Sequence, residues 1–178
     1  EELTEVEVRS HRLMAQHLDY FRANAPGFEN AFMMLSAPQL GVRHTRRLVG
    51  VKAVRREDWP TARVHEDEIA VTPAVSPKFP NISVPFGALV PRTLDGLLAA
   101  GRHISCDRNS HGFMREIPQC WQTGQAAGIG AARAVAEGVE PRNVIIANVQ
   151  SELSRQGVLL RRTDGKFQAK TPHTSAAS

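Results

Sequence analysis

The chain has 178 residues, of which 42% are hydrophobic and 22% are charged, so it is long enough to bury the core of one globular domain. Its formal net charge is +4 at pH 7, but the basic residues form no single tract and no recognisable motif, which argues against a nucleic-acid-binding module. No run of about 18 apolar residues and no signal-peptide pattern occurs, so no membrane span is predicted.

The first half of the chain predicts one long helix and few strands. Thr4 and Glu7 form a capping-box pattern, and apolar residues at helical spacing predict a helix over 4–23. The β-branched segment 46–54 predicts a strand, and residues 69–73 predict a second, short one. Residues 72–87 contain four prolines, a density that predicts an ordered loop or a linker without regular structure.

The second half predicts two short strands and two helices. The apolar segments 87–92 and 96–101 are read as strands, and a polar loop follows them. A helix is predicted over 119–137, ended by Gly138, and Pro141 is expected to open the next helix. Its apolar face is expected to consist of Val144, Ile145, Val149 and Leu153, and Gly157 is expected to end it. The tail from Arg161 is polar, and fraying is expected there.

The strands are too few for a complete sheet. Either the chain forms a small α+β domain, or its strands complete a sheet whose remainder lies on another polypeptide. The printed sequence contains no complete βαβαβ pattern and no G-x-G-x-x-G motif, which a dinucleotide-binding fold places between its first strand and helix.

One stretch has the pattern of a ligand site. An apolar run stops at Gly101, and in α/β proteins ligands bind beyond the carboxyl ends of strands. The next helix begins near Pro118, where unpaired N–H groups favour an anion. Small residues then recur at Gly124, Gly128 and Ala132, a stripe that admits either a flat ligand or another backbone; packing of the helix on a sheet is the alternative.

The stretch "LLAAGRHIS…HGFMREIPQCWQTGQAAG" resembles the C-terminal region of FAD-dependent oxidoreductases of the fumarate-reductase-like, glutathione-reductase-type flavoprotein superfamily. It is similar to the pattern "NLLVAGRCIS…HGSIRVMPTCMATGQAAG" of a bacterial group. Upstream, "PGFENA", "GVRHTRRLVG" and "ALVPRTLDGLLAAGR" are similar to that group's "PGFENA", "GVRESRRIVG" and "ALVPKGVDNLLVAGR". The resemblance covers about residues 4–160.

The resemblance implies an α/β fold, α+β when taken alone, that forms the C-terminal part of a glutathione-reductase-type FAD-binding fold. Its strands would complete a sheet carried mainly by another chain or by a missing N-terminal part. Four segments are expected: a helix and strand returning from a cap region, a proline-rich connection, the C-terminal part of the FAD-binding domain, and a polar tail. Their bounds are 1–60, 61–92, 93–160 and 161–178.

The resemblance also implies FAD as the cofactor and suggests residues for its pocket. Gly101 and Arg102 match the strand-end glycine and the polar residue beside the ribityl-pyrophosphate part of FAD, where Arg102 could pair with a phosphate. The backbone N–H groups at Gln122, Thr123 and Gly124 would meet the N1/C2=O edge of the flavin. The six expected cofactor-binding residues are Gly101, Arg102, Ile104, Gln122, Thr123 and Gly124.

Three residues are candidates for catalysis. His111 and Arg115 form H-G-x-x-R, similar to the "HGANR" of fumarate-reductase-like enzymes, whose arginine holds a substrate carboxylate beside the flavin. Arg46 lies in the stretch that returns from the cap toward the flavin in the family. The alternatives are a loop histidine, an ion-paired arginine and a solvated charge run, respectively.

Departures from the family pattern lie on the expected substrate side. His44 and Thr45 replace Glu and Ser, and His103 and Arg108 replace a cysteine and the first loop histidine. A substrate different from that of the bacterial group with this pattern is therefore expected.

The chain has two cysteines, and only one of them suggests chemistry. Cys106 could be a redox thiol, but the absence of C-x-x-C spacing favours a small buried residue. Cys106 and Cys120 are too few for a disulfide framework, which favours a reducing, cytoplasmic setting. Residues 65–68, "HEDE", have metal-binding types, but their adjacency favours an exposed acidic loop, and no metal is expected.

These observations predict a component, most simply the small subunit, of a heteromeric FAD-dependent oxidoreductase that is inactive without its dinucleotide-binding partner. The start of the chain at a helix cap favours a natural subunit over a fragment. The expected partners are a larger FAD-binding chain and an oxygen-rich or anionic small molecule such as a carboxylate or polyol. The alternative function is a non-catalytic binding or scaffold subunit on a degenerate flavin fold.

Overall fold

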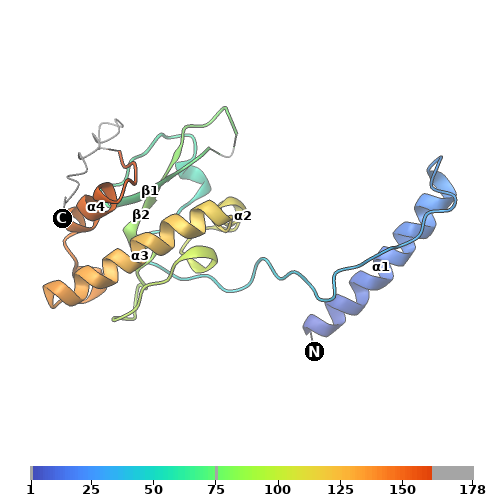
Figure 1. The fold of residues 1–178 in the computed structure, drawn as a ribbon, viewed down its shortest axis with the longest axis horizontal. Coiled ribbons are helices and arrows are strands. Elements are labelled where there is room, and N and C mark those ends of the chain that lie inside the picture. The colour runs from blue at the N-terminus through green and yellow to red at the C-terminus, as the bar shows by residue number, and fades with distance from the viewer. Residues whose placement is uncertain (1, 75, 162–178) are drawn as a thin grey trace, which may run out of the picture. The chain divides into compact units, whose positions relative to one another are not determined.

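The computed structural model describes residues 2–74 and 76–161, and its contacts divide the chain between Thr45 and Arg46 into two compact units (Figure 1). This division falls inside the segment 1–60 that the sequence predicts as one piece. The four predicted segment boundaries themselves stay predictions.

The first unit consists of one long helix and the chain that follows it. Helix α1 spans Glu2–Asn24 and confirms the helix predicted over 4–23. Its end is tied to the next segment, because Arg22 Nε donates to Ala31 O at 2.7 Å and the rings of Phe21 and Phe28 lie 5.7 Å apart. None of the residues of α1, all of which are described, is buried. This unit therefore has no apolar core of its own.

The second unit contains a two-stranded antiparallel sheet. Strand β1 spans Glu68–Thr72 and confirms the short strand predicted at 69–73. Strand β2 spans Ile82–Pro85 and pairs with it, with a bulge after Glu68. The prediction of no regular structure over 72–87 is therefore wrong. Pro80 precedes β2 and Pro85 is its last residue, so the prolines flank the ladder and remove no N–H group from its interior.

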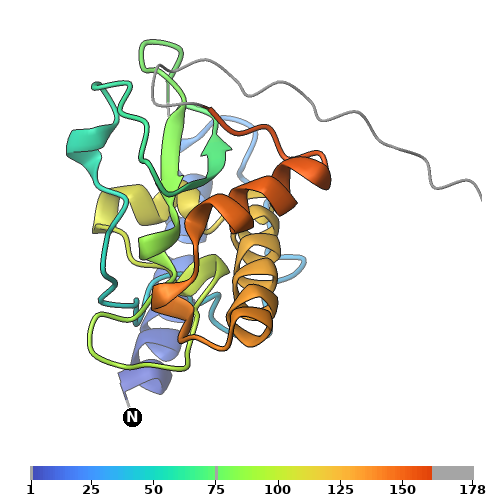
Figure 2. The same cartoon turned by 90° about the vertical axis from the view of Figure 1, so that its left-hand side faces the viewer.

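Three helices accompany this sheet. Helix α2 spans Arg108–Met114, in a stretch predicted to be a loop. Helix α3 spans Ile117–Glu137 and ends at Gly138, whose φ of 64° lies in the left-handed region that favours glycine. This confirms the predicted helix and its stop. Helix α4 spans Ile146–Arg155, and Figures 1 and 2 show it beside α3.

The predicted start of the last helix at Pro141 is wrong. Residues Pro141–Asn143 form only a 3-10 turn, and Val144 and Ile145 are extended before α4 begins. The extended backbone places Val144 in the core, whereas Ile145 is 58% exposed and does not share the apolar face predicted for it.

Three predicted strands do not form, although every residue in them is described. Segments 46–54, 87–92 and 96–101 make only isolated bridges and single backbone hydrogen bonds. The first segment alternates between two neighbours: Lys52 N donates to Gly87 O and Val54 N donates to Ser105 O, both at 3.0 Å. Because neither neighbour follows it for more than a few residues, no regular ladder is established.

The core of the second unit lies between the sheet and helices α3 and α4. Side chains with the lowest exposure include Ile69, Leu89, Met114, Val149 and Leu153. Burying each such aliphatic side chain contributes about 1.5–3 kcal/mol. The helix-rich unit with its small antiparallel sheet is consistent with an α/β fragment of an FAD-binding fold.

A buried ion pair joins Glu68, the first residue of β1, to Arg161. Arg161 Nη2 lies 2.7 Å from Glu68 Oε2, and Arg161 N donates to Glu68 Oε1 at 2.7 Å. The exposures of the two residues are 8% and 0%. The prediction that the tail frays from Arg161 onward is therefore wrong for Arg161 itself. Residues 162–178 lie outside the described residues.

Candidate functional site

Five of the nine predicted site residues, Gly101, Arg102, His111, Arg115 and Thr123, lie where three elements join. The 3-10 turn η3, Gly101–His103, contacts α2 and the first half of α3. Gly101 has φ 68°, a backbone that favours glycine, and its N–H donates to Thr123 Oγ1 at 2.9 Å. The Thr123 hydroxyl in turn donates to Gln119 O at 2.8 Å and is fully buried. The turn is thereby fixed to α3.

His111 is buried beside this turn. Its side chain belongs to α2, is 2% exposed, and places Nε2 3.2 Å from Arg102 O. Since a carbonyl can only accept, Nε2 carries the proton in this contact. The contact links α2 to the residue that follows Gly101. His111 and Arg102 are therefore brought together, as the sequence predicted for a shared site.

Asp107 holds α2 in place. Its carboxylate accepts from Ser110 N at 2.7 Å, as an N-cap, and from Arg56 N at 2.6 Å. Partial burial by itself raises the pKa of Asp107, but the N–H donors of Ser110 and Arg56 outweigh it and the pKa is lowered. A short helix in a polar stretch therefore forms because one side chain satisfies two backbone donors.

An aromatic cluster supports α2 from its other side. Trp59 Nε1 donates to Ser110 Oγ at 3.1 Å, and the Trp59 ring lies 5.5 Å from that of Phe113 and 6.5 Å from that of Phe79. This cluster connects α2 to the chain between residues 56 and 79. It excludes water from the back of the helix that carries His111.

Arg115 ends α2 and borders α3. Its Nη2 lies 3.5 Å from Glu116 Oε1, and its side chain is 28% exposed. Its carbonyl accepts from Cys120 Sγ at 3.3 Å. Arg115 is thus an ion-paired, partly exposed residue at the same junction as Gly101 and His111.

The remaining predicted residues are placed differently. Ile104 is 1% exposed, so its side chain belongs to the core. Gln122 Nε2 donates to Val71 O at 3.2 Å and is directed at β1. Gly124 is exposed on the outer side of α3, and Arg46 is exposed at the start of the second unit. The described side-chain contacts bring none of these four residues to the junction.

The start of α3 lies earlier than the expected flavin contact. The helix begins at Ile117, with Pro118 in its first turn, which confirms a helix start near Pro118. The N–H groups of residues 122–124 lie beyond the first turn, where each bonds the carbonyl four residues before it. The prediction that these N–H groups are available is therefore wrong. The N–H groups of Ile117 and Gln119 lie in the first turn instead.

The sequence analysis missed Asp107, Trp59 and Cys120 as parts of this site. An aspartate three residues before Ser110 is an N-cap signal that could have indicated α2. Trp59 and Cys120 carry no such signal, because their partners lie 51 residues away or across a helix start. Cys120 Sγ is also close to Gly101: a Cβ at position 101 would lie 3.4 Å from it.

Neither cysteine has the properties of an activated thiol. Burial raises the pKa of the Cys106 thiol, and burial and the Glu116 carboxylate raise that of Cys120. Cys106 is 9% exposed, which confirms the expected buried residue.

Segment 65–68 is not the exposed acidic loop expected from its sequence. His65 and Glu68 are buried, and Asp67 binds Lys52 Nζ at 2.6 Å. Burial lowers the pKa of His65. Among the residues that the structure describes, no group of three or more His, Cys, Asp or Glu side chains could hold a metal ion.

Residues 1–153 match the model of a protein family described as FAD dependent oxidoreductase. Searches of curated proteins and of solved structures found no match. In the described part of the chain, no helix has the length and apolar character to cross a membrane. The family match covers well over half of the 178 residues. The chain therefore belongs to the FAD-dependent oxidoreductase family, whose members bind FAD.

Proposed function

We propose that this chain forms one wall of the flavin site in a heteromeric oxidoreductase of the glutathione-reductase-type superfamily. Membership of the FAD-dependent oxidoreductase family supports the reaction class. The observation that carries the proposal is the junction of η3, α2 and α3, where Gly101 N binds Thr123 Oγ1 and His111 Nε2 lies 3.2 Å from Arg102 O. There, hydrogen bonds connect a glycine in a left-handed turn, an exposed arginine and a buried histidine.

The residues present at this junction suit part of an FAD molecule. Gly101 presents its backbone in a left-handed turn, which lets a ligand approach closely. Arg102 is exposed beside it and can pair with a phosphate. The first turn of α3 offers backbone donors to the flavin edge. FAD, when bound, supplies the hydride or electron chemistry.

The chain's own residues would orient the substrate and move a proton. With Nε2 of His111 donating to Arg102 O, Nδ1 would be the ring nitrogen that takes up a proton. Arg115 would hold an anionic substrate group, and Arg46 would contact the substrate from the preceding segment. Burial of His111 and packing of α2 on Trp59 fix the geometry that such a transfer needs.

The outer face of α3 supports the proposed larger partner chain. One stripe of exposed residues on this face recurs at alternating steps of four and three and consists of apolar or small residues: Ile117, Trp121, Gly124, Gly128, Ala131 and Val135. The exposed Gln125 lies outside this stripe. Trp121 is 73% and Val135 is 85% exposed. Apart from the neighbouring residues and the backbone of the helix itself, no heavy atom of the described residues lies within 4 Å of a Cβ placed at Gly124 or Gly128. This stripe suits close packing against the proposed partner. That partner would carry the dinucleotide-binding fold, whose G-x-G-x-x-G motif does not occur in the printed sequence.

The visible absorption spectrum of the purified assembly tests the function. Flavin bands in proportion to the chain are expected, and their absence would leave the alternative of a scaffold subunit on a degenerate flavin fold. The spectrum of the chain purified with its partner is the relevant one, since the proposed site needs both walls.

Arg115→Ala tests the catalytic assignment. If the guanidinium positions an anionic substrate group, turnover should fall by roughly 10²-fold or more, and flavin content should stay unchanged. Glu116→Gln is the matched control, because it breaks the ion pair and keeps the guanidinium. Equal losses in both variants would assign Arg115 to the ion pair alone, and loss of flavin would place it in the cofactor pocket.

A further inference from the structure

Two segments far apart in the sequence run side by side next to the candidate site. They are residues 46–56 and residues 102–108. Val54 N donates to Ser105 O at 3.0 Å, and Asp107 N donates to Val54 O at 3.0 Å. The pairing of the two segments is parallel at this point. The backbones of the two segments therefore meet at Val54, whereas residues 50–52 before it pair with residues 87–91.

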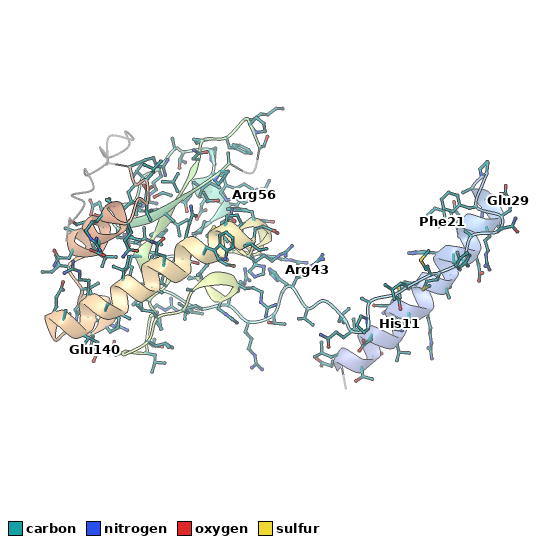
Figure 3. The ribbon with its side chains drawn as sticks, viewed as in Figure 1. His11, Phe21, Glu29, Arg43, Arg56 and Glu140 are labelled. Carbon is teal, nitrogen blue, oxygen red and sulfur yellow. The ribbon has the colours of Figure 1, made fainter. Side chains whose placement is uncertain are left out.

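These two segments are rich in arginine. Arg47 Nη1 donates to Cys106 O at 2.9 Å, so its guanidinium crosses from one segment to the other. Arg56 N donates to Asp107 Oδ2, so Arg56 lies beside the start of α2 (Figure 3). Arg108 is the next residue, and it is exposed. We call the following residues the arginine edge: Arg46, Arg47, Arg56 and Arg108.

Acidic side chains do not neutralise the arginine edge. Within residues 2–74 and 76–161, Arg46, Arg56 and Arg108 form no ion pair. The acid nearest in sequence to Arg108 is Asp107, and its two oxygens already accept backbone N–H groups. Glu57, which follows Arg56, pairs with Arg55. The edge therefore has an excess of positive charge, and Arg46, Arg56 and Arg108 are exposed.

The arginine edge adjoins the proposed flavin site. Leu48 N donates to His103 O at 2.8 Å, and His103 follows Arg102, whose carbonyl contacts the His111 ring. All four cations of the edge are arginines, whose planar fork binds a carboxylate or phosphate through two parallel hydrogen bonds. An anion held by the edge would thus lie beside the residues proposed to orient a substrate.

We propose that the arginine edge binds a carboxylate or phosphate group of the substrate. This inference rests on the proposed function and narrows its substrate class from oxygen-rich or anionic molecules to anionic ones. The observations favour a small anion over an acidic protein, because the edge continues into the junction with Arg102 and His111.

Isothermal titration calorimetry of the flavin-containing assembly tests this inference with two anions, succinate and inorganic phosphate, and with uncharged succinamide. Binding of succinate or of phosphate is expected, and the anion that binds identifies the group. Removing two guanidinium contacts in Arg56→Gln/Arg108→Gln should weaken that binding about tenfold or more, since one charge-assisted contact is worth about a factor of ten.

The matched control removes two positive charges elsewhere. Arg133→Gln/Arg155→Gln changes one residue in the second half of α3 and the last residue of α4, and should leave anion binding unchanged. Equal weakening in both double variants would overturn the proposal, as it would indicate a general charge effect. So would binding of succinamide as tight as that of succinate, or the absence of anion binding to the wild-type assembly.

Flavin content separates this inference from the proposed function. Absorbance of bound flavin should be the same in the wild type and in Arg56→Gln/Arg108→Gln. Loss of flavin in that variant would overturn the inference and assign the edge to the cofactor's phosphates. An assembly without any flavin would instead refute the proposed function, whatever its affinity for succinate or phosphate.

Discussion

Asp107 is the residue on which α2 depends most directly. Its carboxylate satisfies the N–H groups of Ser110 and Arg56. Asp107→Ala should lower the free energy of unfolding by about 1–2 kcal/mol, the usual loss for an N-cap, and chemical denaturation measures it. Asp107→Asn should be milder because an oxygen acceptor remains. Glu57→Ala, which breaks an exposed pair with Arg55, is the control and should change stability little.

The same carboxylate predicts a dependence of stability on pH. The pKa of Asp107 is lower in the folded state than in the unfolded chain. The stabilisation is therefore present above the unfolded value of about 3.9 and is lost as the pH falls through the folded pKa. Between pH 7 and pH 3, wild type should lose more stability than Asp107→Asn. Parallel pH profiles for the two proteins would contradict this assignment.

The ion pair of Glu68 and Arg161 is the other sensitive point at this scale. Both groups are buried, so removing one leaves an uncompensated charge. Glu68→Gln should destabilise the second unit by about 3–5 kcal/mol, measured as a shift of the thermal or denaturant midpoint. The double variant Glu68→Gln/Arg161→Met should recover much of the loss. If the double variant is as unstable as the single one, the penalty is not that of an unpaired buried arginine.

At the scale of elements, the two faces of α3 respond oppositely to an added methyl group. Gly124 is open, and alanine there should stabilise the isolated chain by up to about 1 kcal/mol through helix propensity. A Cβ at Gly130 would lie 2.7 Å from the Phe86 ring, so Gly130→Ala should destabilise it through overpacking. Circular dichroism melts of both variants test this contrast.

In the assembly, by contrast, a larger side chain at Gly124 should be unfavourable. If the outer stripe of α3 packs against a partner or the flavin, larger side chains at this position should weaken association or flavin occupancy while the chain itself stays folded. Gly124→Val is the stronger version, and Ala147→Val, at an exposed position of α4, is its control. Equal flavin occupancy in the two valine variants would exclude the stripe from the interface.

At the scale of the whole molecule, the exposed apolar surface predicts that the chain does not behave as an independent flavoprotein. The first unit has no buried residue in α1, and α3 exposes Trp121 and Val135. We expect the chain alone to self-associate and to bind no FAD. Light scattering after gel filtration and a titration with FAD measure the two outcomes. A monomer that binds FAD tightly would refute the need for a partner.

Local signals in the sequence determined the helices that begin and end at recognisable residues. Apolar residues at helical spacing indicated α1, although Thr4 lies inside this helix, which begins at Glu2, and does not cap it. Pro118 and Gly138 bounded α3, because prolines and glycines act on their own backbone neighbours. The resemblance at Gly101, His111 and Arg115 suggested a site near the start of α3, and this assignment stays a prediction. These features need no knowledge of distant contacts.

Only the tertiary structure decided which extended segments became strands and which side chains reached the site. Segments 46–54 and 87–92 have strand-like composition, yet ladders need a continuous neighbour, and each neighbour here departs after a few residues. Residues 82–85, between prolines, gained such a neighbour in β1. The arginine edge arises from the same cause, because long-range hydrogen bonds, which no local pattern encodes, bring residues 46–56 beside residues 102–108.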